Sequence, residues 1–408
     1  MTDKQIDKHI PRLRFPEFQN EGAWNESLFG DLFMFLPNNT LSRADLKEGA
    51  GNVYNVHYGD VLIKLNAYTD IQSEKLPAIK NVADISKYQN ARLQNGDIVI
   101  ADTAEDETVG KCTEIVNTQE TIVVSGLHTI PCRPRIKFAQ AFLGYYMNSS
   151  SFHNRLRHIM QGVKVTSISK SALQNIYLTF PKSLEEQQKI ASCLSSIDSY
   201  ISSINEKIEQ LKAHKKSLLQ KLFPQNGKTV PEYRFPEFRQ DGEWKRKNLK
   251  EIITVNSGRD YKHLDAGEIP VYGTGGYMLS VNDKLSDIDA VGIGRKGTID
   301  KPQYLKAPFW TVDTLFFLTS IEGYDIEFVY YLAQNIPWKK YGEQTGVPSL
   351  SKLSIENLEV LVPANKAEQK RISTMLSSLD YELLLLEKKM LLLKTHKNGL
   401  VQQLFPPK

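Results

Sequence analysis

The chain contains little cysteine and no long apolar run. Its three cysteines, Cys112, Cys132 and Cys193, lie far apart and form no Cys-X-X-Cys pair. This spacing argues against a disulfide framework and against a structural zinc site, and it favours a reducing compartment. No stretch approaches the roughly 18 consecutive apolar residues that cross a bilayer, and the polar N-terminus lacks the pattern of a secretory signal. We therefore expect a cytoplasmic protein without a membrane segment or a bound metal.

Catalytic motifs are also missing. The stretch Gly292–Gly297 resembles a phosphate-binding loop, but its lysine precedes the last glycine, which is the wrong order. The glycines of Gly273–Gly276 lack the spacing of a dinucleotide-binding fingerprint. The eight histidines form no His-X-X-X-His pair. The sequence therefore predicts a protein with no catalytic residues of its own.

What the sequence does contain is a long heptad pattern between Ser183 and Pro224. Its apolar steps alternate between three and four residues, which predicts a helix packed along its length, roughly 60 Å, against another helix. Ser183 and Glu186 form a capping box, and Pro224 ends the helix because a residue before proline avoids the α region. The expected seam positions are Leu194, Ile197, Ile201, Ile204, Ile208, Leu211 and Lys215.

The same pattern recurs 182 residues later. Asn365 and Glu368 repeat the cap, and Lys397 repeats the polar seam position of Lys215. Two unrelated core helices would not keep one register over the whole pattern, so we expect the second helix to be the partner of the first. Its seam positions are Leu376, Leu379, Leu383, Leu386, Met390, Leu393 and Lys397.

A second repeat opens each half of the chain. The motif Arg-Phe-Pro-Glu-Phe at 14–18 returns at 234–238, an offset of 220, so the first half carries 38 additional residues (220 − 182). Similar ends with dissimilar middles indicate one duplicated frame that holds two different globular segments. The predicted division is a first domain, 1–181; a first long helix, 182–224; a second domain, 225–363; and a second long helix, 364–408.

Both globular segments show short β-rich runs bounded by turn residues. The predicted strands include Val53–Val56, Val61–Leu65 and Asp97–Ile100 in the first segment, and Ile269–Tyr272 and Ala290–Ile293 in the second; the predicted helices include Phe138–Met147 and Ile326–Gln334. A glycine- and serine-containing stretch, 162–169 and 346–351, precedes each long helix.

This order predicts an α+β protein in which two mixed α/β domains are separated by an antiparallel coiled coil and related by a pseudo-twofold axis. The seam lysines, Lys215 and Lys397, either fix the register of the helices or extend their charges to solvent.

Polar and basic residues with interspersed tyrosines make both domains suitable for binding. The net charge of +4 permits a polyanionic partner without requiring one. Arginine suits guanine, asparagine suits adenine and lysine suits phosphate, although solvated loops often have a similar composition. The candidate DNA contacts are Asn38, Asn39, Thr40, Arg43, Asn66, Tyr68, Thr69 and Lys164 in the first domain, and Arg259, Tyr261, Lys262, Tyr272, Thr274, Tyr277, Arg295 and Lys296 in the second.

The whole chain resembles the DNA-specificity subunit of type I restriction-modification systems. The resemblance rests on the repeated Arg-Phe-Pro-Glu-Phe opening, on the Gly, Ser and Glu-Gln stretch before each long helix, and on the segments 269–277 and 292–298. It implies two target-recognition domains, each reading one half of a bipartite, asymmetric site in double-stranded DNA. It also implies that the helix pair sets the spacer between the half-sites.

The resemblance further implies the partners of the chain in a bacterial cytoplasm. Two methyltransferase subunits would dock on the helix pair, and two restriction-translocase subunits would join for cleavage. S-adenosylmethionine, ATP and Mg would belong to those partners, with no cofactor bound by this chain.

Two other functions are weighed against this one. A non-enzymatic coiled-coil scaffold could bind protein or carbohydrate ligands through its tryptophans and tyrosines. A fused methyltransferase-nuclease is disfavoured because the cofactor and metal motifs are missing.

Overall fold

A computed structural model of the chain describes residues 9–82, 85–162, 164–225, 227–342 and 348–407. The predicted stretch 346–351 therefore begins outside the described residues. The chain divides into two compact units: unit 1, Met1–Ser203 with Met390–Lys408, and unit 2, Ile204–Lys389. Each unit combines one globular part with a portion of both long helices, and each is described by itself. The division of the chain at 181, 224 and 363 stays a prediction.

The globular part of unit 1 contains a five-stranded sheet of order β2-β11-β7-β9-β5 and a four-stranded sheet of order β10-β4-β6-β3. In the larger sheet β5 runs parallel to β9, and its other pairs are antiparallel. The strands are β1 (Asn25–Leu28), β2 (Phe33–Phe35), β3 (Leu46–Lys47), β4 (Val53–Val56), β5 (Tyr68–Asp70), β6 (Ala78–Ile79), β7 (Ile98–Ala101), β8 (Thr103–Ala104), β9 (Cys112–Val116), β10 (Ile122–Ser125), β11 (Thr129–Pro134), β12 (Thr166–Ser167) and β13 (Tyr177–Phe180). The short helices are α2 (Phe29–Leu32), α3 (Tyr58–Ile63), α4 (Phe142–Met147), α5 (Ser150–Leu156) and α6 (Lys170–Leu173).

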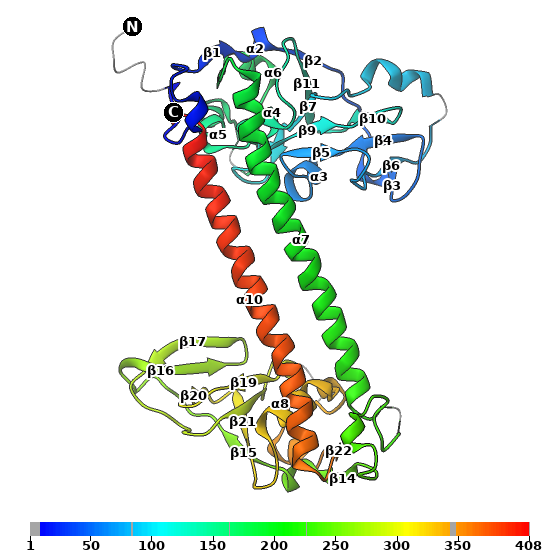
Figure 1. Cartoon of the computed structure of the whole chain (residues 1–408), viewed down its shortest axis with the longest axis vertical. Helices are drawn as coiled ribbons and strands as arrows, with labels where there is room; N and C mark the ends of the chain where they lie inside the picture. Colours follow the sequence, from blue (N-terminus) through cyan, green and yellow to red (C-terminus); the bar gives the residue numbers. More distant parts are fainter. Residues whose placement is uncertain (1–8, 83–84, 163, 226, 343–347, 408) are drawn as a thin grey trace. The chain divides into compact units, whose positions relative to one another are not determined.

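Unit 2 is built from fewer strands. An antiparallel sheet has the order β15-β21-β18-β19, and a three-stranded sheet has the order β17-β16-β20. The strands are β14 (Lys245–Asn248), β15 (Ile253–Ser257), β16 (Ala266–Gly273), β17 (Gly276–Val281), β18 (Ala290–Gly294), β19 (Gln303–Leu305), β20 (Trp310–Thr311), β21 (Leu315–Ser320) and β22 (Glu359–Val362). The short helices are α8 (Ile326–Asn335) and α9 (Lys352–Glu356). Figure 1 shows the hairpin β16-β17 extending as a long ribbon from the rest of this unit.

The two predicted long helices are confirmed as α7 (Leu184–Leu222) and α10 (Lys366–Leu404). In unit 1, Ile190 and Leu194 near the start of α7 share a core with Leu404 at the end of α10. In unit 2, Leu222 at the end of α7 shares a core with Ile372 near the start of α10. The helices are therefore antiparallel in each unit.

A buried ion pair anchors the start of each long helix. In unit 1, Arg14 donates to both carboxylate oxygens of Glu186, at 2.8 and 2.7 Å, and Trp24 Nε1 donates to the same carboxylate at 3.2 Å. In unit 2, Arg234 and Trp244 make the same contacts with Glu368, at 2.8, 2.8 and 3.3 Å. The duplicated motif thus holds a duplicated structural joint.

The opening motif also contacts the end of the other helix. The backbone N–H of Leu13 donates to the carbonyl of Gln403 at the end of α10, and the N–H of Tyr233 donates to the carbonyl of Lys221 at the end of α7. Each motif therefore holds the first turn of one long helix beside the last turn of the other.

The seam lysines bridge the two helices instead of extending to solvent. Lys397 Nζ lies 2.5 Å from Asp198 Oδ1, and its ammonium lies 5.3 Å from the ring centroid of Tyr145. The hydroxyl of Tyr145, on α4, donates to Asp198 Oδ2 at 2.7 Å. In this way one cluster joins α7, α10 and the globular part of unit 1.

The equivalent cluster occurs in unit 2 with the helices exchanged. Lys215 Nζ lies 2.5 Å from Asp380 Oδ1 and 5.3 Å from the ring centroid of Tyr331, whose hydroxyl donates to Asp380 Oδ2 at 2.8 Å. Since both alternatives for the seam lysines were open, this geometry favours their role in fixing the register. All fourteen predicted seam residues are buried or half-buried.

One predicted strand is wrong. Residues Val61–Leu65 lie largely in α3 and not in a strand. The helix starts because His57 Nδ1 accepts from the N–H of Gly59 at 3.1 Å, which caps the first turn. A short apolar run does not distinguish a buried strand from a helix, so the cap decides. The other predicted strands overlap β4, β7, β16 and β18, and the predicted helices overlap α4 and α8.

A buried carboxyl in unit 1 makes its stability depend on pH. Glu114 accepts from the N–H groups of Ala141 and Gly144, at 2.7 and 3.1 Å, and burial raises its pKa from 4.5 to about 7. A carboxyl whose pKa is higher in the folded state stabilises the fold fully below pH 4.5, and this contribution is lost as the pH rises to 7. We expect a loss of about 3 kcal/mol over that window. In Glu114→Gln, urea unfolding across this window should lack this component; an unchanged difference between variant and wild type at all pH values would contradict the assignment.

Within the part of the chain that the structure describes, no helix is both long and apolar enough to cross a membrane.

Candidate nucleic-acid interface

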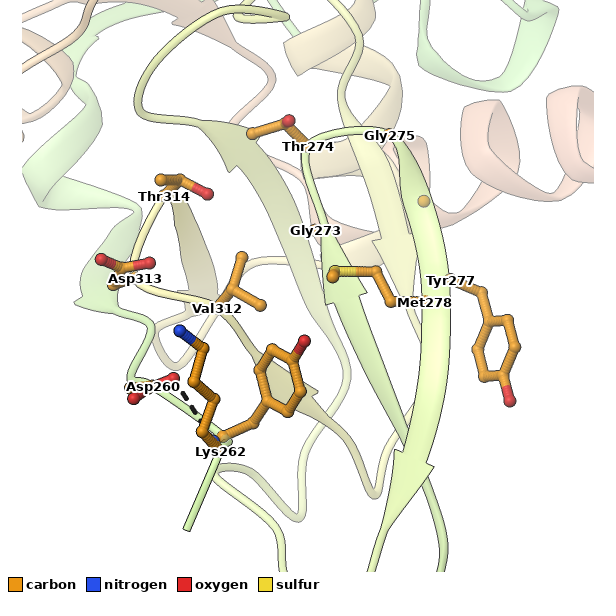
Figure 2. A pocket seen from close by; sticks show the side chains of 12 residues that line it. Asp260, Lys262, Gly273, Thr274, Gly275, Tyr277, Met278, Val312, Asp313 and Thr314 are labelled. Carbon is orange, nitrogen blue, oxygen red and sulfur yellow. Dashed lines mark hydrogen bonds between the residues drawn. The ribbon is translucent and has the colours of Figure 1, made fainter. Parts of the chain in front are cut away.

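A cleft of about 660 Å³ lies in unit 2 beside the hairpin β16-β17 (Figure 2). Its walls come from three segments that are distant in sequence: the loop after β15, the turn between β16 and β17, and the loop between β20 and β21. The lining residues are Asp260, Tyr261, Lys262, Gly273, Thr274, Gly275, Gly276, Tyr277, Met278, Val312, Asp313 and Thr314. Hydroxyl, ammonium, carboxylate and backbone amide groups therefore border one space.

The glycines of the hairpin turn leave the cleft open. A side chain at Gly275 or Gly276 would meet no atom within 4 Å, and Gly276 has a positive φ of 111°. The turn therefore brings backbone groups to the surface without a side chain that covers them. Gly258 and Gly294 have a different role, because a Cβ there would collide with the carbonyl oxygens of Val312 and Thr298. Those two glycines are needed by the protein's own packing and not by a ligand.

The charges of the cleft are mixed. The exposed Lys262 side chain is accompanied by two exposed carboxylates, Asp260 and Asp313, and Asp260 Oδ1 accepts from the backbone N–H of Lys262 at 3.3 Å. In Figure 2 the Lys262 side chain lies on the side of Val312, whereas Tyr277 points outward beyond its strand. Such a surface offers a cation for phosphate together with acceptors and hydroxyls for base edges.

The structure brings together most of the residues predicted in the second domain. Tyr261, Lys262, Thr274 and Tyr277 line the cleft, and the ring centroid of Tyr272 lies 6.5 Å from that of Tyr277. The exposed Arg259 immediately precedes the cleft residue Asp260 in the chain.

Two further basic residues follow β18 at the border of this cleft. The backbone N–H of Arg295 donates to the carbonyl of Thr314 at 2.8 Å, and its guanidinium lies 5.9 Å from the Phe316 ring centroid. Lys296, the next residue, is exposed and pairs through its backbone with Ser349. The predicted set of unit 2 thus gathers around one hairpin.

The residues predicted in the first domain are more dispersed. Asn39 is an internal anchor, because its side chain donates to Asn55 Oδ1 at 2.7 Å and to the Ser125 carbonyl at 2.9 Å. Its exposed neighbours Asn38 and Thr40 are held by this anchor at the surface. Arg43 is also exposed, and it pairs with the buried Asp60 at 2.6 Å.

Thr69 is corrected. Its side chain is 2% exposed and its hydroxyl shares a hydrogen bond of 2.7 Å with Thr113, so it has no surface for a base or a phosphate. The neighbouring Tyr68 packs edge-on against Tyr145, with ring centroids 6.2 Å apart. Lys164 is exposed in the loop before β12, away in sequence from the other predicted residues.

A second cleft, of about 430 Å³, lies in unit 1 and includes Asn66. Sequence reasoning missed its most buried cation, Lys111, whose Nζ donates to the Leu62 carbonyl at 2.8 Å and whose pKa is lowered by burial. Lys397 and His153 also line this cleft. No local pattern signals it, because its walls come from segments that are far apart in the chain.

Two unlike β-rich domains on a duplicated helical frame, with clefts bordered by basic, amide and tyrosine side chains, define a two-domain recognition protein. The family model of the type I restriction modification DNA specificity domain matches residues 22–213 and 241–394. These segments make up more than half of the chain, which therefore belongs to this family.

Two curated relatives come from Methanocaldococcus jannaschii. The putative type I restriction enzyme MjaX specificity subunit is 31% identical over 164 residues, covering 40% of this chain and 35% of that protein. The type I restriction enzyme MjaVIII specificity subunit is 31% identical over 143 residues, covering 34% of this chain and 30% of that protein. The chain thus spans about a third of the length of the curated relatives it matches.

Solved structures share the fold. The type I restriction-modification S subunit from M. genitalium matches with a TM-score of 0.65 and 17% identity, covering 98% of this chain and 99% of that one. A structure described as the basis of complex assembly and conformational transition of the type I R-M system matches with a TM-score of 0.52 and 15% identity, covering 94% and 97%. The predicted fold class and family resemblance are confirmed.

No group of three or more His, Cys, Asp or Glu residues is positioned to hold a metal ion among the described residues.

Proposed function

We propose that this chain is the sequence-specific DNA-recognition subunit of a type I restriction-modification complex. Each globular part reads one half of a bipartite, asymmetric site, and the antiparallel helices set the spacer between the two halves. The observation that carries the proposal is the duplicated frame around two unlike binding surfaces. The Arg14–Glu186 and Arg234–Glu368 joints are alike, whereas the sheets and clefts they support differ.

The two different clefts support the asymmetry of the site. The cleft in unit 2 is built around a glycine-rich hairpin, and the cleft in unit 1 around Asn66, Lys111 and His153. Surfaces with different hydrogen-bonding groups select different base sequences, so a palindromic site is not expected.

The partners in this proposal are two methyltransferase subunits, which dock on the helix pair, and two restriction-translocase subunits. The methyltransferase subunits bring S-adenosylmethionine, the restriction-translocase subunits use ATP and Mg, and this chain binds none of these. The complex works in a bacterial cytoplasm. The mild net charge of +4 fits a subunit that contacts DNA as part of a larger complex.

A non-enzymatic scaffold for protein or carbohydrate ligands is the alternative weighed on the sequence alone. Membership of the DNA-specificity family does not favour it.

The test of the proposal is the substitution Arg295→Ala. Arg295 is exposed at the border of the unit 2 cleft, so its loss should relax recognition in one half-site and leave the other unchanged. A lost bidentate base contact lowers discrimination by roughly 10- to 100-fold. The measurement is long-read methylation mapping of DNA from cells that express the chain with its methyltransferase.

The matched control is Lys245→Ala, which removes one exposed positive charge from β14 in the same unit. It should preserve the bases read in both half-sites. Equal relaxation of both halves in Arg295→Ala would contradict separate readers, and an absence of any sequence-specific methylation with the wild-type chain would contradict the proposed function itself.

A further inference from the structure

Helix α10 carries an uncovered apolar stripe on its outer face. Tyr381, Leu384, Leu385, Leu391 and Leu392 are between 47% and 65% exposed. With 3.6 residues per turn these positions lie on one side of the helix, opposite the seam residues Leu383, Leu386 and Met390. An exposed row of large apolar side chains on a helix is typical of a surface that another protein covers.

Helix α7 lacks this stripe although the two helices are repeats of each other. The positions 182 residues earlier hold only polar side chains, all exposed. They are Ser199, Ser202, Ser203, Glu209 and Gln210. The internal repeat is therefore kept in the seam and in the Lys–Asp–Tyr clusters but broken on the outer face.

The charges around the stripe indicate its occupant. Lys388 is exposed at the centre of the stripe, midway between the pairs Leu384-Leu385 and Leu391-Leu392. A second copy of α10 that seated leucine pairs on leucine pairs, in either direction, would place Lys388 against its own copy. Like charges at the centre of an apolar contact are unfavourable, so the stripe does not suit self-association.

The acidic residues beside the stripe are already used. Glu382 pairs with Lys207 at 2.8 Å, and Glu387 pairs with Lys212 at 3.1 Å, both on α7. The charge presented around the stripe is therefore positive, from Lys388 and Lys394. This surface fits an amphipathic helix with an apolar face and acidic residues opposite Lys388.

We infer that the outer face of α10 is the primary docking site for a helix of one methyltransferase subunit, and that the equivalent face of α7 binds the second copy more weakly. The inference rests on the proposed function and adds an order of assembly to it. The complex passes through an intermediate with one methyltransferase subunit per chain, because the two faces differ in apolar surface.

The test is a titration of the full-length chain with its methyltransferase subunit, followed by native mass spectrometry and sedimentation. Two binding steps whose dissociation constants differ by at least about tenfold are expected, since the loss of buried anchors has effects of this size. The variant Leu384→Ser, Leu385→Ser, Leu391→Glu and Leu392→Gln gives α10 the face of α7. It should lose the tight step and keep the weak one.

The reverse exchange is the matched variant. Ser202→Leu, Ser203→Leu, Glu209→Leu and Gln210→Leu give α7 the face of α10, and the second step should tighten by at least about tenfold. This arm tests the inference by itself where the first variant fails to fold, which circular dichroism would show.

Three outcomes would overturn the inference. Equal affinities for the two copies, or a tight step that survives in the α10 variant, would leave the proposed function standing and refute the order of assembly. Self-association of the isolated chain that the α10 variant abolishes would assign the stripe to a second copy. Complete absence of methyltransferase binding to the wild-type chain would remove the proposed function as well.

Discussion

Replacing Glu368 with alanine should lower the free energy of unfolding of unit 2 by about 3–5 kcal/mol, because a buried charge loses its partner. The Glu368 and Arg234 side chains are only 1% and 7% exposed, and the pair is bidentate. The hydrogen bond to Glu368 raises the pKa of Arg234, so the guanidinium remains charged after the carboxylate is removed. Trp244 Nε1 would also lose its acceptor. Hydrogen exchange with peptide resolution measures the loss in each unit.

Three variants delimit this result. Glu186→Ala should produce the same loss in unit 1, because Arg14 and Trp24 repeat the contacts. Glu359→Ala removes a pair whose side chains are both more than half exposed, and should change stability by less than about 1 kcal/mol. The double variant Arg234→Met with Glu368→Leu should recover much of the loss, because no charge is left unpaired. An effect of Glu368→Ala as small as that of Glu359→Ala would show that the joint does not stabilise the unit.

The duplicated frame could be predicted from the sequence because it is written in identical residues. Arg14 and Arg234, Glu186 and Glu368, and Lys215 and Lys397 stand at constant offsets, and a constant offset requires a common structure. The long helices could be bounded closely for the same reason, since a cap and a proline mark their ends.

The partners of those residues could not be predicted. Asp198 and Asp380 are visible as a repeated pair in the sequence, yet each bonds to a lysine of the opposite helix and to a tyrosine of a globular part. Such contacts depend on how segments fold together and not on local pattern.

The binding surface was predicted unevenly for a related reason. In unit 2 one glycine-rich hairpin gathers the predicted residues, so composition and position agree. In unit 1 a polar residue such as Thr69 looks the same in sequence whether it faces solvent or, as here, a buried threonine on the neighbouring strand. Lys111 was missed because nothing near it in the chain marks a cleft.

The two Lys–Asp clusters provide a way to test whether the helices set the spacer. Asp198 and Lys215 are 17 residues apart on α7, and Asp380 and Lys397 are 17 residues apart on α10 (215 − 198 and 397 − 380). Both ion pairs therefore require helical segments of equal length. Duplicating one heptad, residues 201–207, in α7 alone adds about 10.5 Å to one helix and leaves the other unchanged. This variant should lose one cluster or the joints at the helix ends, with failure to assemble.

A second duplication in α10 should restore the structure. The heptad 383–389 is the equivalent of 201–207, and repeating both keeps the seam and the equal spacing of the clusters. The paired variant should recover the thermal stability of the wild type and methylate a site whose spacer is longer by about three base pairs, because base pairs are stacked at about 3.4 Å. Methylation mapping reads the spacer directly. An assembled, active complex of the paired variant with the original spacer would show that the helices hold the domains together without measuring the distance between the half-sites.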